Sequence, residues 1–377
     1  MTIRTAELEE SDLRHWRLLD QFRRRLKPLA VPACELSVES RRKLLEEDYF
    51  CLLLFGLFNP ALKSMRALCH ASGRFEKMRQ VCSAPVKPAS FSEAQHVFDP
   101  ETLVQILRQL AHEAKGRGDF GDERVRQAVQ CLTAVDGTVL RAVNRMTWAC
   151  VGKNGSAIKL HTHFSVFDQI PEDWTITPAN VCERKTLKAK AQPEAFYVAD
   201  RLYSDDYEFL GRLVRQGTDF VFRLPPSAIR SPVEPARPLT PEDRAAGVVS
   251  DCLEKLGAKY NGPPVRVVEV HAAGKIIVLV TSRRDLPAEL IGLIYRYRWQ
   301  IELFFKWLKT ILGCAHWMAE SQRGVAMQVY AALIASLLLM VSTGRRPTKR
   351  QMEAISLYFT GFVTEAELIR ELELQKS

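Results

Sequence analysis

Short apolar runs alternate with helical segments in the middle of the chain, and this alternation constrains the fold more than any other feature. The runs are too short for helices and predict buried strands: Val129–Val135 (VQCLTAV), Phe196–Ala199 (FYVA) and Phe220–Leu224 (FVFRL). Between the last two, Asp205–Gln216 has the spacing of a helix. Strands that alternate with helices predict an α/β fold.

The sequence changes character on both sides of this region. Residues 1–118 carry helical patterns throughout, and Asp99-Pro100 places an N-cap before a first-turn proline. We predict an all-helical N-terminal domain here, which is equally compatible with a DNA-binding role and with a plain helical subdomain. We predict an α/β domain over residues 119–345 and a helical C-terminal tail over residues 346–377.

One segment interrupts the succession of strands. Pro225–Pro264 is rich in Pro, Arg and Glu and poor in aromatic residues, so we predict an inserted and partly disordered element. Strands are expected again at Val265–His271 and Ile276–Thr281. The insertion as a whole covers about residues 225–280.

Composition limits the class of protein. The chain of 377 residues has a net charge of +9 and a pI near 9.1, which favours a polyanionic partner, either nucleic acid or a membrane surface. The nine cysteines include no C-x-x-C pair, so we expect reduced thiols and no zinc cluster. No secretory signal is expected at the N-terminus. The apolar run Val325–Val341 contains Gln328 and Ser336, and it predicts a buried core helix in place of a membrane span.

Three carboxylates stand out by their positions. Asp136 and Asp200 each follow a short apolar run, with Gly137 expected to form a turn, and Glu302 lies on a later helix. Side chains at the ends of adjacent strands converge at one sheet edge, where a packed helix can add a third. Such a cluster needs cations, and hard divalent ions prefer oxygen ligands. For each Asp alone, an ordinary turn residue is the alternative.

The helix that carries Glu302 has a polar stripe. Tyr295, Arg298, Glu302 and Lys309 fall within an arc of about 60° on a continuous α-helix. Arg298 can bind two phosphate oxygens at once, Lys309 acts as a point charge, and Tyr295 can donate one hydrogen bond. The alternative is a solvated i,i+4 ion pair between Arg298 and Glu302.

These motifs resemble those of one family. AVDGT at 134–138, VADRLYSD at 198–205 and Tyr295-x2-Arg298-x3-Glu302-x6-Lys309 are similar to the motifs of DDE transposases of the insertion-sequence-four type, whose YREK signature has this last spacing. The resemblance covers roughly residues 85–345. It implies a ribonuclease H-like catalytic core, in which helices flank a mixed sheet, with a β-rich insertion between the second Asp and the final Glu.

The resemblance also implies roles for individual residues. Asp136, Asp200 and Glu302 would hold two Mg²⁺ ions, or Mn²⁺, and two such ions can activate a nucleophile and stabilise a leaving oxygen. Tyr295, Arg298 and Lys309 would bind backbone phosphates of the DNA.

The reaction implied is cut-and-paste transposition. The protein would hydrolyse double-stranded DNA at the terminal inverted repeats and join the freed 3′-OH ends to target DNA, acting as a homodimer. It would be cytoplasmic and nucleoid-associated, without a membrane partner. In this family the first attack commonly makes a hairpin on the element end, where an aromatic residue of the insertion can hold a flipped base. Pro225–Gly274 offers only Tyr260 and His271 for that role, so the sequence supports the hairpin step less than it supports the metal chemistry.

Two other functions remain open at this point. A related metal-dependent nuclease or integrase would share the three acids but lack strand transfer. A catalytically idle element copy would bind DNA without cutting it.

Other candidate residues have simpler explanations. His161 and His163 share a face of one strand, and we expect a sheet-face pair in place of a metal site. Asp205 and Asp206 are expected to open the following helix. For Arg201 and Arg223, DNA contact and ion pairing are equally supported. Trp299, Trp307 and Trp317 are expected to be packing residues.

Overall fold

The computed structural model describes residues 17–29, 44–118, 120–151, 155–259, 262–312, 317–346 and 348–374. The chain divides into two compact units, and each is described by itself. The helical unit consists of Met1–Gly118, Leu140–Ile158 and Phe305–Ser377, and the sheet unit consists of Asp119–Val139 and Lys159–Phe304.

The helical unit is built around one long apolar helix, α13. Its helices are α2 (Arg17–Leu26), α3 (Glu46–Phe58), α4 (Met65–Arg74), α5 (Pro88–Val97), α6 (Pro100–Ala114), α13 (Gln322–Thr343), α14 (Lys349–Phe359) and α15 (Glu365–Leu374), with short 3₁₀ turns η1 (Glu76–Gln80) and η2 (Thr147–Ala149). α13 packs against α2, α3, α5 and α6. By length and composition it is the one helix among the described residues that could cross a membrane, but 83% of its apolar window is buried inside the protein. The predicted core helix at Val325–Val341 is therefore confirmed.

The predicted N-cap of α6 is also confirmed. The Asp99 side chain accepts a hydrogen bond from the Glu101 N–H at 3.1 Å, and Pro100 is the first helical residue. The helix starts here because the carboxylate satisfies an N–H that has no partner inside the helix, whereas proline has no N–H to satisfy.

The sheet unit contains most of a mixed sheet of nine strands in the order β3-β2-β1-β4-β5-β9-β8-β7-β6. The strands are β1 (Thr133–Arg141), β2 (Ala157–Ser165), β3 (Ile170–Pro178), β4 (Phe196–Ala199), β5 (Asp219–Arg223), β6 (Arg230–Pro232), β7 (Val248–Leu256), β8 (Val265–Ala272) and β9 (Lys275–Thr281). β1, β4 and β5 are parallel neighbours, and β9 joins β5 in the antiparallel direction. The predicted α/β fold and the mixed sheet implied by the family resemblance are confirmed.

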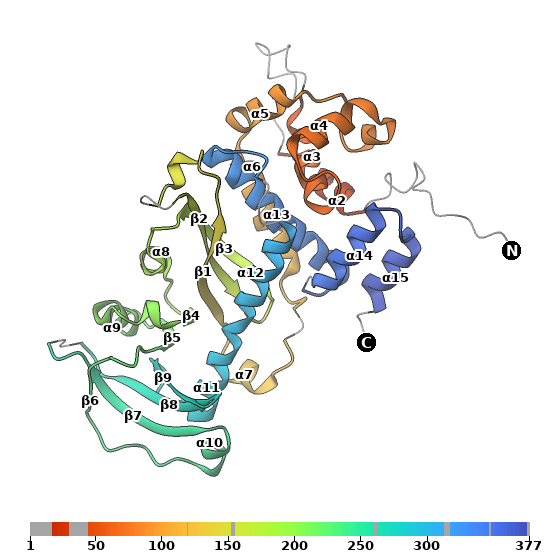
Figure 1. The fold of residues 1–377 in the computed structure, drawn as a ribbon. Helices are drawn as coiled ribbons and strands as arrows, with labels where there is room; N and C mark the ends of the chain where they lie inside the picture. Colours follow the sequence, from red (N-terminus) through yellow and green to blue (C-terminus); the bar gives the residue numbers. More distant parts are fainter. Residues whose placement is uncertain are drawn as a thin grey trace. The chain divides into compact units, whose positions relative to one another are not determined.

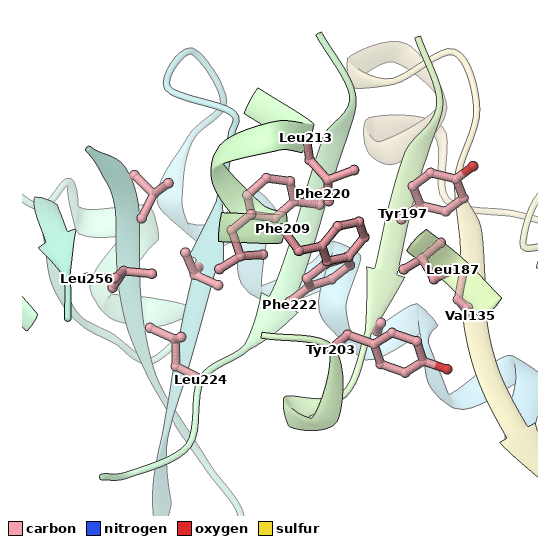
Figure 2. Close-up of a cluster of buried hydrophobic side chains, with 14 of the residues drawn as sticks. Val135, Leu187, Tyr197, Tyr203, Phe209, Leu213, Phe220, Phe222, Leu224 and Leu256 are labelled. Carbon is pink, nitrogen blue, oxygen red and sulfur yellow. The ribbon is translucent and has the colours of Figure 1, made fainter. Parts of the chain in front are cut away.

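Helices connect and cover these strands. They are α7 (Glu123–Ala128), α8 (Glu183–Lys190), α9 (Tyr207–Arg215), α10 (Pro241–Ala245), α11 (Ala288–Tyr297) and α12 (Trp299–Ile311), with the 3₁₀ turn η4 (Arg201–Tyr203) directly after β4. Phe209 and Leu213 of α9 pack with Phe220 and Phe222 of β5 in one buried cluster (Figure 2). Because α9 buries this apolar face, the strand ends beside it are held in place.

The insertion is more regular than its composition suggested. β6, α10 and β7 form within residues 225–259, and β7 to β9 extend the central sheet (Figure 1). Thr240 and Asp243 form a capping box at the start of α10, and Arg266 makes a buried ion pair with Asp251 at 2.7 Å. The expectation of partial disorder is wrong for these residues, because sheet pairing and buried polar contacts order a segment that is poor in aromatic residues.

Candidate active site

Asp136 and Asp200 are brought together by the register of two parallel strands. Val135 of β1 pairs with Ala199 of β4, so the next residues along the two strands, Asp136 and Asp200, are neighbours. Asp200 follows the last residue of β4 and begins the η4 turn.

Asp136 differs from the prediction in one respect. β1 does not end there but continues through Gly137 to Arg141, so the expected turn at Gly137 is wrong. A glycine inside a strand commonly marks a close approach by another group. Here a Cβ at Gly137 would lie 2.8 Å from the carboxyl carbon of Glu183.

Arg298 links the strand carboxylate to the helix carboxylate. Its guanidinium lies 2.6 Å from Glu302 Oε1 and 3.9 Å from Asp136 Oδ2. The Arg298 side chain is only 14% exposed. The i,i+4 ion pair considered above therefore exists, but it is largely buried and includes a third charged group, so it differs from a solvated surface pair.

Tyr295 reaches the remaining carboxylate. Its hydroxyl donates a hydrogen bond to Asp200 Oδ1 at 3.4 Å, and its ring lies 5.7 Å from the Arg298 guanidinium carbon. Tyr295 and Arg298 together thus contact all three predicted acids. Burial raises the pKa of Tyr295 above its ordinary value, so the hydroxyl stays a donor at neutral pH.

The polar stripe is carried by two helices and not by one. α11 ends at Tyr297 and α12 begins at Trp299, with Arg298 between them. The Arg298 N–H bonds to Tyr295 O at 3.1 Å, an i→i−3 contact that tightens the turn, while its φ and ψ of −52° and −32° remain helical. The single continuous helix was wrong, but the break is small enough that Tyr295, Arg298 and Glu302 still converge.

The Asp136 carboxyl has an altered proton affinity. Burial raises its pKa to about 6 from an ordinary 3.8, and the nearby charges of Glu183 and Glu302 add to the rise. The Gly137 N–H, which bonds to Asp136 Oδ1 at 2.8 Å, and the Arg298 guanidinium oppose it. A buried acid beside other acids is poised to accept a cation.

Comparison with known proteins identifies the family of this chain. Residues 127–338 match the family of the transposase DDE domain. The chain belongs to the DDE transposase family.

Several transposases are similar to this chain. It is 26% identical over 279 residues to the putative transposase y4zB of Sinorhizobium fredii, which covers 69% of this chain and 77% of that protein. It is 29% identical over 236 residues to the probable transposase of insertion sequence element IS5377 of Geobacillus stearothermophilus, covering 62% of this chain and 61% of that protein. A shorter match, 32% identical over 91 residues, is to the putative transposase of IS4SA of Synechocystis, covering 23% of this chain and 27% of that protein.

The donor chemistry of this DDE transposase suits a hard divalent ion. Asp136, Asp200 and Glu302 offer oxygen ligands, and the Arg298 guanidinium already places one cation between two of them. Within the described ranges, no group of three or more His, Cys, Asp or Glu side chains is close enough to hold a metal ion. Arg298 lies between Asp136 and Glu302 and offsets part of their negative charge.

Lys309 is the last member of the predicted stripe. It lies on α12 seven residues after Glu302, in the part of that helix that belongs to the helical unit. Its contact with DNA stays a prediction.

A cavity of about 680 Å³ adjoins the site within the sheet unit. Tyr295 and Arg296 of α11, Arg124 of α7 and His271 of β8 contribute to its lining, together with Glu289. His271 was one of two aromatic candidates in the insertion, and the other, Tyr260, lies outside the described residues. The cavity therefore offers cations next to the Tyr295 that contacts Asp200.

The histidines and acids with simpler explanations behave as expected. His161 bonds to the Thr177 hydroxyl at 2.8 Å and His163 packs edge-on against the Tyr197 ring, so the histidines are sheet-face residues. Asp206 caps α9 by accepting the Phe209 N–H.

The three tryptophans do not behave alike. Trp307 is buried, as predicted for a packing residue. Trp317 donates a hydrogen bond from its indole N–H to Arg141 O at 2.6 Å. Trp299 is 57% exposed, so its assignment as a packing residue is wrong. It precedes Glu302 by three residues, about one helical turn.

Sequence reasoning missed Glu183. It opens α8 and lies against β1 beside Asp136, although its position in the sequence, after a strand and at a helix start, is that of many ordinary helix-opening acids. Only the folded chain shows its neighbours.

Proposed function

We propose that this DDE transposase is a metal-dependent enzyme that cleaves DNA at the ends of a mobile element and joins those ends to target DNA. Asp136, Asp200 and Glu302 would be the metal ligands. The observation that carries the proposal is the convergence of these acids on one Arg–Tyr pair, with two of them placed side by side by strand register.

The ions implied by this chemistry are two Mg²⁺, or Mn²⁺. When bound, they would supply Lewis-acid stabilisation of a phosphodiester and an activated attacking group. The protein side chains would do the rest. Arg298 can bind phosphate oxygens through its planar guanidinium, while Tyr295 holds Asp200 and Lys309 adds a positive charge along α12.

The fold supports a finer assignment of the core. The strand order β3-β2-β1-β4-β5, with β1, β4 and β5 parallel, is the arrangement that we assign to a ribonuclease H-like core. Strands β6–β9 would then be the insertion between the second Asp and the final Glu. We further propose that the N-terminal helices bind the terminal inverted repeats, that a homodimer pairs two ends, and that the protein acts at the nucleoid.

A cleavage and joining assay tests the reaction. Purified protein is incubated with Mg²⁺ and a duplex that carries the terminal repeats found beside the gene. Joined products support transposition, nicks alone indicate a nuclease or integrase, and binding without cleavage indicates an idle copy.

The site assignment is tested by Glu302→Gln. Loss of one metal ligand removes several kcal/mol of transition-state stabilisation, so we expect cleavage to fall by about 10³-fold or more. Binding measured by gel shift should persist and should weaken steeply with added salt, because phosphate contacts release counterions. Cleavage at the wild-type rate by the variant would remove Glu302 from the site.

A further inference from the structure

Gly137 leaves room for the Glu183 side chain beside Asp136. A Cβ at Gly137 would lie 2.8 Å from both Cδ and Oε1 of Glu183 and 2.9 Å from its Cγ. Real Cβ atoms do not approach other atoms so closely. The φ angle of Gly137 is not positive, so its backbone conformation does not require glycine. Glycine is therefore required at this position because a larger residue would collide with a neighbour, and that neighbour is the carboxylate of Glu183.

Two further contacts fix that carboxylate. Lys159 Nζ of β2 lies 3.2 Å from Glu183 Oε1, and both side chains are only 13% exposed. The Tyr203 hydroxyl donates to Glu183 Oε2 at 3.4 Å, and Tyr203 is 1% exposed. Tyr203 belongs to η4, the turn that follows its N-cap residue Asp200.

Glu183 thus connects the segments that carry the two aspartates. On one side it lies against β1 at the residue after Asp136, and on the other it holds the turn that follows Asp200. The Tyr203 ring is part of the buried cluster that also contains Val135 of β1 (Figure 2). A fourth acid therefore lies beside Asp136 and has its own cationic partner, Lys159.

We propose that Glu183 is a positioning residue for the metal site: its carboxylate sets the separation of the Asp136 and Asp200 segments and adds negative charge beside Asp136. This inference rests on the proposed function, because it assumes a cation at Asp136 and Asp200. Glu183 is not assigned as a ligand. Partners outside the ligand shell that orient metal ligands commonly change metal affinity by about 10- to 100-fold.

The rival explanation is a structural ion pair that fastens α8 to β2. Both explanations predict some loss of stability when Glu183 changes, because Lys159 is left without its buried partner. They differ in metal affinity, which a purely structural pair would leave unchanged. Metal binding is therefore the measurement that separates them.

The experiment is a titration of the full chain with Mn²⁺ alone, in which electron paramagnetic resonance measures the free and the bound metal. The variants are Glu183→Gln, Gly137→Ala and the double variant. Gly137→Ala keeps the backbone N–H that bonds to Asp136 and displaces only the far end of the Glu183 side chain. Glu208→Gln is the matched control, because Glu208 also opens a helix of the sheet unit but is exposed.

We expect each single variant to weaken Mn²⁺ binding by about tenfold. The double variant should be no weaker than either single one, because Gly137 and Glu183 act through the same carboxylate. The control should bind as the wild type does, and circular dichroism should show the native helix content in all variants.

Three outcomes would overturn the inference. Wild-type affinity in Glu183→Gln refutes the role of Glu183, and multiplied losses in the double variant refute the link to Gly137. If the wild-type chain binds no Mn²⁺, the proposed function fails and the inference fails with it, so the two failures are distinguishable.

Discussion

Replacing Asp136 by Asn should stabilise the protein at neutral pH while removing a proposed metal ligand. The pKa of Asp136 is raised to about 6 in the folded chain, first by burial, against an ordinary 3.8. Between these two values the native state keeps a proton that the unfolded state has released. Stability therefore falls as pH rises through this window, and above pH 6 the full cost of a buried ionised carboxylate is present.

The magnitude follows from the difference in pKa. About two pKa units correspond to about 3 kcal/mol, since each unit is worth about 1.4 kcal/mol. The Asp136 side chain is 22% exposed, so little of this is lost to solvent screening. Asn keeps the size of Asp and its Oδ1 can still accept the Gly137 N–H. We expect Asp136→Asn to raise the free energy of unfolding by about 2–3 kcal/mol above pH 6 and by almost nothing below about pH 4.

The assay is urea unfolding with EDTA present, monitored by circular dichroism at several pH values from 4 to 8. Asp205→Asn is the control, because Asp205 is exposed and its replacement should change stability by less than about 0.5 kcal/mol. In a second series, Mg²⁺ should stabilise the wild-type chain and not Asp136→Asn. Equal stability of the two proteins at pH 7.5, or a difference that is largest at pH 4, would refute the argument.

Two further changes test contacts inside each unit, one in the sheet unit and one in the helical unit. Arg266→Ala should lower the free energy of unfolding by about 3–5 kcal/mol, because Asp251 would remain as an uncompensated charge at 6% exposure, and replacing both residues by apolar ones should restore most of the loss in urea unfolding. A loss below 1 kcal/mol for Arg266→Ala would contradict this. Gly324→Ala should cost about 1–3 kcal/mol, because the new Cβ would overlap with Ala319 and Gln95 at the start of α13. Thermal unfolding by calorimetry measures it, and an unchanged midpoint would show that these neighbours can move.

Much of the fold follows from local patterns. The predicted strands at Phe196–Ala199 and Phe220–Leu224 and the predicted helix at Asp205–Gln216 are present with nearly the expected bounds. Such elements are predictable because the period of apolar residues and the helix caps act over a few residues. The course of the chain at Gly137 was not predictable in this way. A glycine after an acid looks like a turn, and the carboxylate that requires it is supplied by Glu183, far along the sequence.

The candidate site was likewise predictable in part, in its residue types but not in their contacts. Residue types, their spacing and the family resemblance together led to the proposal of Asp136, Asp200 and Glu302 as the acids of the site and of Arg298 as a cation. Their contacts were not, because the guanidinium lies between two carboxylates only after β1 and α12 have packed. Trp299 illustrates the limit, since helical spacing cannot show whether a flanking tryptophan faces the core or solvent.

The sequence by itself determined the family and the α/β alternation, and it supplied the three acids on which the proposed chemistry rests. These depend on residue identity and on short-range periodicity, which the chain carries wherever it folds. Tertiary structure alone decided that β1 runs through Gly137, that the insertion is ordered as part of the sheet, and that Glu183 joins the acids. Each of these depends on a contact between residues that are distant in the chain. Such a contact contributes to stability only after the intervening segments have folded and brought the two residues together.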